Sequence, residues 1–167
     1  MEYFVCSLLC AVTTYGSCCG DVTKFATANP AGGGLATEDR KILENASRFH
    51  EVHTTSDLPP AIIALCAGDS GKLADPGQKW NATDAITDPT LPGKRLIWAA
   101  IGGDYYVVHY ERGGIAHTFH VLVATRTKGE TKPKVVWSAM GGPFDKYAAF
   151  VDALRSGKLD DRTDYPH

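Results

Sequence analysis

The sequence predicts an α+β fold: a helix, a shorter second helix, a meander of about five antiparallel strands and a last helix. Three observations predict it. Apolar residues recur at helical spacing over residues 42–52 and again over residues 144–154. Runs rich in Val, Ile, Tyr, Phe and Trp fill residues 94–126, as in pleated strands. Gly102-Gly103 and Gly113-Gly114 separate these runs and suit the positive φ of tight hairpin turns.

The domain is expected to begin near Thr37, after a flexible linker over residues 21–36 that contains a Pro-Ala-Gly-Gly-Gly run. Thr37 can cap a helix, and two acidic residues that follow it suit the positive end of the helix. The apolar stripe of this first helix is Ile42, Leu43, Ala46, Phe49 and Val52. A second helix is expected over residues 58–65, with two prolines in its first turn and Gly68 at its end.

The central strands are expected at residues 94–101, 104–112 and 115–126, with a further strand over residues 134–139. An edge strand over residues 80–86 would place Trp80, Ala82 and Ile86 inward. The last helix is expected to open at Gly142-Pro143 and to end at Gly157. Its apolar face is Phe144, Tyr147, Phe150, Val151 and Leu154. The helices are expected to pack on one face of a curved sheet, with a polar tail at residues 161–167 after the domain, residues 37–160.

The two diglycine turns set an expected register for the central strands. As two-residue loops, they pair Ile101 with Asp104 and Arg112 with Ile115. Side chains alternate between the two faces of a sheet, so His109 and His120 would be diagonal neighbours on one face. The opposite face would carry Arg95, Tyr110 and His117. A slip of one residue would reverse these assignments.

The length and charge narrow the functional classes. A chain of 167 residues is long enough for one domain with a substantial core. Its net charge of −2 disfavours a nucleic-acid partner or an electrostatically bound membrane surface. The basic side chains are densest in an expected hairpin loop, where we interpret them as a solvated turn: Arg126, Lys128, Lys132 and Lys134.

The N-terminus predicts export. Residues 3–12 form an apolar run that has the length of a signal-peptide core and is too short to span a bilayer. We therefore interpret residues 1–20 as an export signal or lipoprotein-like segment and expect a periplasmic or cell-envelope location. Lipidation at Cys18 would supply the only membrane anchor, although Tyr15 replaces the branched aliphatic residue of the lipoprotein pattern and the segment lacks Lys and Arg. The alternative is a buried or frayed N-terminal segment.

The cysteines are concentrated in the same N-terminal segment. Cys6, Cys10, Cys18 and Cys19 precede the linker, and Cys66 is the only cysteine of the expected domain. An internal disulfide in the domain is thereby excluded. We expect Cys66 to be a buried free thiol, with pairing to Cys19 as the alternative.

Four histidines form a candidate zinc site: His50, His53, His109 and His120. Imidazole is a preferred zinc ligand, and a catalytic zinc would keep one position open for water. Glu51 or Glu44 would be the candidate base. The helical and sheet pairs meet only where the first helix covers the His109 face. The alternative is that the first pair interacts with the end of a helix dipole and the second pair consists of cross-strand polar residues.

Arg95, Tyr110 and His117 form a candidate ligand-binding site, with Glu111 and Arg112 at the end of the strand. A guanidinium offers a planar fork of donors, and Tyr and His add directional hydrogen bonds to a carboxylate or polar ligand. The alternative is an arginine stacked on a surface aromatic ring.

Two other kinds of residue have structural interpretations. The three tryptophans, Trp80, Trp98 and Trp137, are expected in the core or against the sheet. Asn45-Ala46-Ser47 and Asn81-Ala82-Thr83 fit the glycosylation pattern, but such short patterns occur often by chance.

The function best supported by these features is a small exported, non-enzymatic domain that binds a protein partner or a small ligand. No catalytic residue and no cofactor are assigned. One alternative is a His-dependent hydrolase, with or without zinc. Another is a structural component of an envelope assembly.

Overall fold

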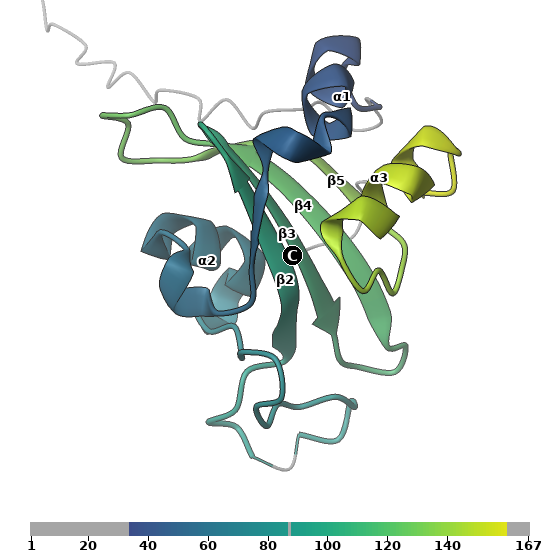
Figure 1. Ribbon diagram of the computed structural model, residues 1–167. Coiled ribbons are helices and arrows are strands. Elements are labelled where there is room, and N and C mark those ends of the chain that lie inside the picture. Colours follow the sequence, from purple (N-terminus) through teal and green to yellow (C-terminus); the bar gives the residue numbers. More distant parts are fainter. Residues whose placement is uncertain (1–33, 87, 160–167) are drawn as a thin grey trace, which may run out of the picture.

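The computed structural model describes residues 34–86 and 88–159, which form the expected α+β fold (Figure 1). Its sheet is antiparallel, with strand order β1-β2-β3-β4-β5. The helices and strands are α1 (Thr37–Glu44), β1 (His50–Val52), α2 (Pro60–Ala67), β2 (Lys94–Gly102), β3 (Tyr105–Arg112), β4 (Thr118–Thr125), β5 (Lys134–Met140) and α3 (Tyr147–Arg155). The expected export segment, nearly all of the linker and the polar tail lie outside the described residues.

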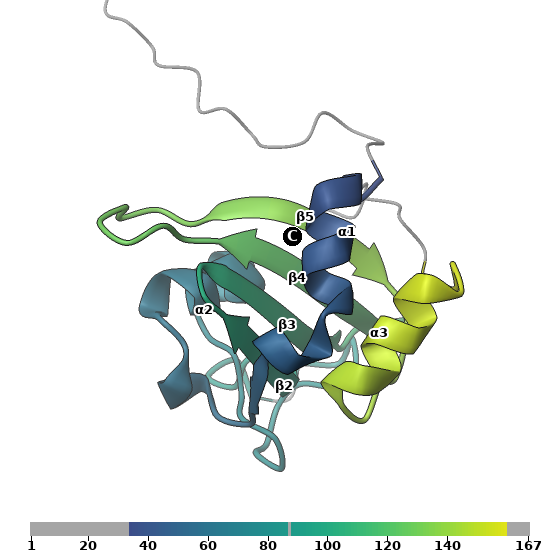
Figure 2. The same ribbon diagram turned by 45° about the horizontal axis from the view of Figure 1, so that its top comes forward.

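Helices cover both faces of the sheet, so the expectation that all pack on one face is wrong. Figure 2 shows α1 and α3 side by side over one face, here called the α3 face, with α2 behind the sheet. Buried side chains form two separate clusters, one under α1 and α3 and the other under α2. The physical reason is that the strands carry apolar residues on both faces of the sheet. Each apolar face must be buried by packing against a helix.

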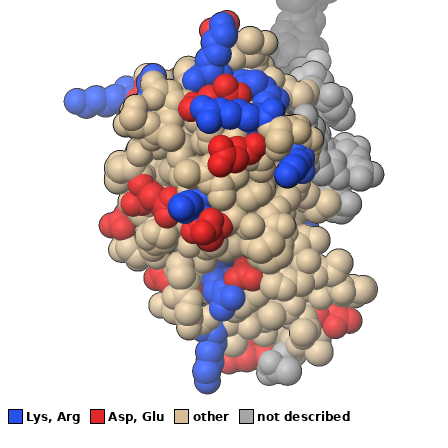
Figure 3. Space-filling model, turned by 45° about the vertical axis from the view of Figure 1, so that its right-hand side comes forward, with Lys and Arg blue, Asp and Glu red and all other residues tan. Residues whose placement is uncertain are grey.

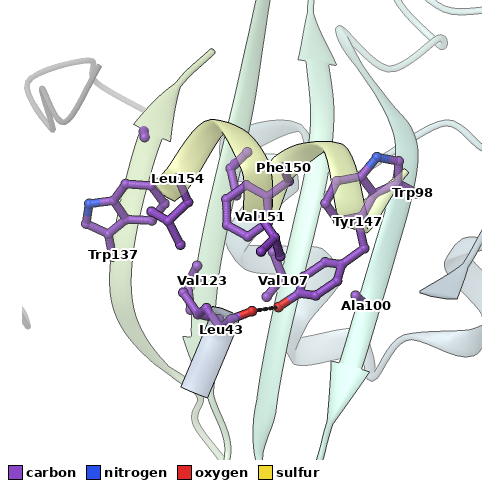
Figure 4. Close-up of a cluster of buried hydrophobic side chains, with 12 residues drawn as sticks. Leu43, Trp98, Ala100, Val107, Val123, Trp137, Tyr147, Phe150, Val151 and Leu154 are labelled. Carbon is purple, nitrogen blue, oxygen red and sulfur yellow. Dashed lines mark hydrogen bonds between the residues drawn. The ribbon is translucent and has the colours of Figure 1, made fainter. Parts of the chain in front are cut away.

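The core of the α3 face joins the two ends of the domain (Figure 4). Phe150 and Leu154 of α3 are buried with Trp98 of β2, and the Tyr147 hydroxyl donates to the Leu43 carbonyl of α1 at 2.8 Å. Trp98 and Trp137 are core residues, as expected. In the part of the chain that the structure describes, no helix combines the length and apolarity needed to cross a bilayer.

The first helix is shorter than the sequence predicts. It ends at Glu44, and the chain passes through a 3₁₀ turn, Ala46–Arg48, into β1. Residues His50–Val52 pair with Ile101, Ala100 and Ala99 of β2. The apolar stripe looked helical because Phe49 and Val52 follow at a spacing of three, but this segment supplies a pairing partner for the edge of β2, and tertiary pairing overrides the local pattern.

The first hairpin turns one residue later than predicted. Gly102 pairs with Tyr105 inside the ladder, and the loop consists of Gly103 and Asp104. Gly103 has the positive φ, 64°. Gly102 meets a different need: a Cβ there would lie 2.7 Å from the ring of Phe49. One glycine of the pair makes the turn, and the other allows close packing.

The second hairpin has a longer loop than predicted. Arg112 pairs with Thr118 and not with Ile115, so the loop covers residues 113–117. Gly113 and Gly114 donate backbone hydrogen bonds to the carbonyls of Gly93 and Ala82, at 3.0 and 3.3 Å. Because the register moves by three residues, an odd number, every β4 side chain lies on the face opposite to the one predicted.

Residues 80–86 are not a strand. Together with residues 88–92 they form an irregular segment, here called the capping loop, and Ile86 is 67% exposed. The position beside the first half of β2 is taken instead by Ala74, which bridges to Arg95. The last helix begins at Tyr147, five residues after the expected opening, and Gly157 follows its end with a φ of 66°.

Candidate functional site

A buried carboxylate organises the polar end of the α3 face. The Glu111 side chain is 7% exposed, and its Oε1 accepts from Arg95 Nε at 2.5 Å. Its Oε2 lies 2.6 Å from His117 Nε2, and a carboxylate can only accept, so Nε2 carries the hydrogen. The β2–β3 register places Arg95 directly opposite Glu111, and His117 immediately precedes β4 at the same end of the sheet.

Trp80 packs over both partners of this carboxylate. The Arg95 guanidinium lies 5.1 Å from the centre of the indole ring, and the His117 ring lies 5.5 Å from it. A cation over an indole face is attracted by the ring quadrupole. Trp80, Arg95, Glu111 and His117 are together called the Glu111 cluster. Trp80 therefore packs against the sheet at this polar site and belongs to neither of the two core clusters.

The capping loop holds Trp80 in this position through Asn81. The Asn81 backbone N–H donates to the Pro92 carbonyl at 2.9 Å, and its side-chain Nδ2 donates to the Asp88 and Leu91 carbonyls at 2.8 and 3.1 Å. The loop lies directly against Gly113, where a Cβ would stand 2.8 Å from Ala82 Cα. Apart from the glycosylation pattern that begins at Asn81, nothing in the sequence indicates that this residue holds the capping loop in place.

A hollow of about 280 Å³ adjoins the cluster at His117. Its lining comes from the start of β4 with the residue before it, and from the end of β5 with the two residues after it: His117, Thr118, Phe119, Met140, Gly141 and Gly142. The His117 ring packs 5.0 Å from the Phe119 ring. Ile115, in the loop before His117, is 94% exposed. The hollow thus places apolar surface next to a half-exposed imidazole.

Of the three predicted ligand-binding residues, the structure brings Arg95 and His117 together and separates them from Tyr110. Tyr110 lies on the α2 face, 3% exposed and stacked on His120 with ring centres 5.2 Å apart. The Lys94 ammonium lies 5.5 Å from the Tyr110 ring centre. Burial raises the pKa of the Tyr110 phenol well above its ordinary value. The sequence indicates Glu111 only as a residue at the strand end beside the predicted site. In the structure its carboxylate contacts both Arg95 and His117.

His109 is a core residue with both ring nitrogens engaged. Nδ1 donates to the His120 carbonyl at 2.9 Å, and Nε2 accepts from the Phe144 N–H at 3.1 Å. The side chain has no exposed surface, and this burial lowers its pKa to about 4. Trp98 Nε1 donates to the Phe144 carbonyl at 2.9 Å. The neutral imidazole therefore fixes the segment before α3 to the sheet.

The four histidines of the candidate zinc site do not meet. His120 lies on the face opposite to His109, with Nε2 2.8 Å from the Thr118 hydroxyl. His50 and His53 are exposed at β1, where His53 pairs with Glu51. Among residues 34–86 and 88–159, no group of three or more His, Cys, Asp or Glu side chains is arranged to hold a metal. Zinc binding remains an untested prediction.

Both candidate bases, Glu51 and Glu44, contact α3. Glu51 Oε2 accepts from the Tyr147 N–H at 2.7 Å, at the start of α3, and Arg155 donates to the Glu44 carbonyl at 2.9 Å.

Cys66 is a buried free thiol, as expected, and the Lys94 ammonium donates to its carbonyl at 2.8 Å. On the side of the molecule in Figure 3, basic and acidic side chains are interspersed.

Comparison with known proteins gives no identification: the chain matches no protein family, no curated protein and no solved structure. The function must therefore be argued from the site.

Proposed function

We propose that this protein is a small exported, non-enzymatic domain that binds a protein partner or a small ligand through the Glu111 cluster. The supporting observation is the buried Glu111 carboxylate, which holds Arg95 by Nε and His117 by Nε2. The guanidinium Nη groups and the imidazole Nδ1 then remain to contact a ligand. Side chains locked by a supporting carboxylate bind with a smaller loss of conformational entropy.

Exposure also supports this proposal. The His117 side chain is 45% exposed and that of Arg95 is 30% exposed, so a ligand can reach both. Trp and Arg are the residue types that dominate binding energy in protein interfaces. Ile86 and Ile115, the large hydrophobic residues most exposed in the described part of the chain, lie in the two loops that meet beside the cluster. Export rests on the apolar run at residues 3–12 alone.

The test is to purify the full-length protein from its native host and identify what it retains, by native mass spectrometry. Arg95→Gln and His117→Gln should each lose the retained ligand or partner. The matched controls are Arg48→Gln and His50→Gln, which remove an exposed arginine and an exposed histidine outside the cluster. Retention of the same material by all five proteins would place binding elsewhere and contradict the proposal.

A His-dependent hydrolase is the second candidate, because the Glu111–His117 hydrogen bond orients the imidazole beside the hollow. With Nε2–H donated to the carboxylate, Nδ1 is an acceptor that could take a proton from water. This function predicts hydrolysis of p-nitrophenyl acetate by the wild type that His117→Gln abolishes. Equal rates for the two proteins would eliminate it.

A further inference from the structure

Resting on the proposed function, we infer that the ligand of the Glu111 cluster is a carboxylate attached to a small apolar group. Arg95 and His117 bind the carboxylate, and the hollow beside His117 receives the apolar group. Charge, donor geometry and the size of the hollow each support this ligand class.

The charge of the cluster suits a single negative charge. The Arg95 guanidinium and the Glu111 carboxylate, in contact at 2.5 Å, sum to zero. A carboxylate adds one negative charge next to the Arg95 guanidinium, whereas a dianion such as a phosphate monoester would add two negative charges beside buried Glu111.

The donors are directed by contacts already made inside the protein. Arg95 uses Nε toward Glu111, and its planar guanidinium still offers Nη hydrogens in a rigid fork, the geometry that matches two carboxylate oxygens. His117 uses Nε2 toward Glu111, and its Nδ1 takes no part in that bond. Both donor groups approach Glu111 from the same end of the sheet, one on each carboxylate oxygen.

The hollow is open to solvent and offers a small apolar group a place to bind. Its volume of about 280 Å³ lies below the range of roughly 300–1,000 Å³ that is usual for drug-sized ligands. Phe119 and Met140 supply ring and thioether surface, and the two glycines, Gly141 and Gly142, add no side chain. One aromatic ring or a short branched chain would fit. Such a ligand is either a free organic acid or the C-terminal residue of a peptide.

The experiment titrates the full-length ¹⁵N-labelled protein with phenylacetate and follows the resonances of Trp80, His117 and Phe119 by NMR. Phenylacetamide lacks the charge, and acetate lacks the ring, so each should bind at least about tenfold more weakly than phenylacetate. Equal affinity for the amide would overturn the carboxylate assignment. Equal affinity for acetate would overturn the assignment of the hollow.

Variants of the Glu111 cluster test which residues bind phenylacetate. Arg95→Gln should weaken phenylacetate binding by about tenfold or more, and Arg95→Lys should also weaken it because the charge stays but the fork is lost. His117→Gln, at a half-exposed position, should fold and also bind more weakly. Arg48→Gln is the control and should bind like the wild type. Unchanged binding in folded Arg95→Lys and His117→Gln would overturn the proposal.

A pair of peptides distinguishes a free organic acid from the C-terminal residue of a peptide as the ligand. A short peptide that ends in phenylalanine is compared with the same peptide amidated at its C-terminus. Tighter binding of the free-acid peptide than of phenylacetate assigns the ligand to a peptide end, and the reverse order assigns it to a small acid. Equal binding of both peptides overturns the inference. If no carboxylate binds but native material is still lost in Arg95→Gln, the inference fails while the proposed function stands.

Discussion

The buried imidazole of His109 should make the stability of this protein depend on pH. Burial lowers its pKa to about 4 in the folded protein, from 6.5 in an unperturbed histidine. Below 6.5 the unfolded chain therefore binds more protons at this position than the folded one. The stabilisation is complete above the unfolded pKa and is lost as the pH falls toward the folded pKa.

The size of the effect follows from the two pKa values. Linkage between proton binding and unfolding gives a loss of about 2 kcal/mol at pH ~5 and about 3 kcal/mol at pH ~4, relative to pH ~7.5. Because a small protein has a urea m-value of roughly 1–3 kcal/mol per M, the midpoint of urea unfolding should move by about 1 M between pH ~7.5 and pH ~5.

The assay is urea unfolding followed by circular dichroism at these two pH values, for the wild type, His109→Gln and His50→Gln. Glutamine can still accept from the Phe144 N–H but does not titrate. Between the two pH values, the His109→Gln variant should lose about 2 kcal/mol less of its unfolding free energy than the wild type does. His50 is exposed, so its variant should retain the wild-type dependence. The same pH dependence in all three proteins would refute the reasoning.

Three further predictions concern the core and the capping loop. Gly113→Ala places a methyl group against the capping-loop backbone and should destabilise the fold by about 1–3 kcal/mol in urea unfolding, whereas Gly93→Ala, with open space at Cβ, should change stability by less than about 0.5 kcal/mol; equal effects would contradict the packing argument. Burial raises the pKa of the Cys66 thiol to about 12, so mass spectrometry of its peptide should show no alkylation at neutral pH until the protein is unfolded, and rapid labelling of the native protein would contradict this. Tyr147→Phe removes the hydrogen bond to the Leu43 carbonyl and should cost about 1–3 kcal/mol in unfolding free energy, so an unchanged urea midpoint would show that the bond contributes nothing.

The sequence alone determined the elements whose signals are local. Pro60 stands in the first turn of α2, and Gly68 ends that helix with a φ of 61°, as predicted. Gly157 similarly follows the end of α3. The β-branched and aromatic runs at residues 94–126 and 134–139 form strands of the sheet. These features are predictable because backbone geometry at each position depends mainly on the residue itself and its near neighbours.

The candidate site was only partly predictable. The sequence groups Arg95 with His117, and the two do meet, but it predicts Tyr110 as the third member, whereas the observed centre is Glu111. The β3–β4 register moved by three residues, which exchanged the faces of the β4 side chains. Trp80 belongs to the cluster, although the alternating apolar residues around it predict an edge strand.

Only the tertiary structure decided these points, because a glycine pair has two uses that look alike in sequence. Gly102 and Gly113 could each have supplied the positive φ of a tight turn, and both instead leave room for another segment: the Phe49 ring in one case and the capping-loop backbone in the other. Which use applies depends on residues distant in the chain. Since side chains alternate along a strand, the longer loop after Gly113 sets the face of the β4 side chains, and the bulge between Leu96 and Trp98 of β2 places Arg95 opposite Glu111.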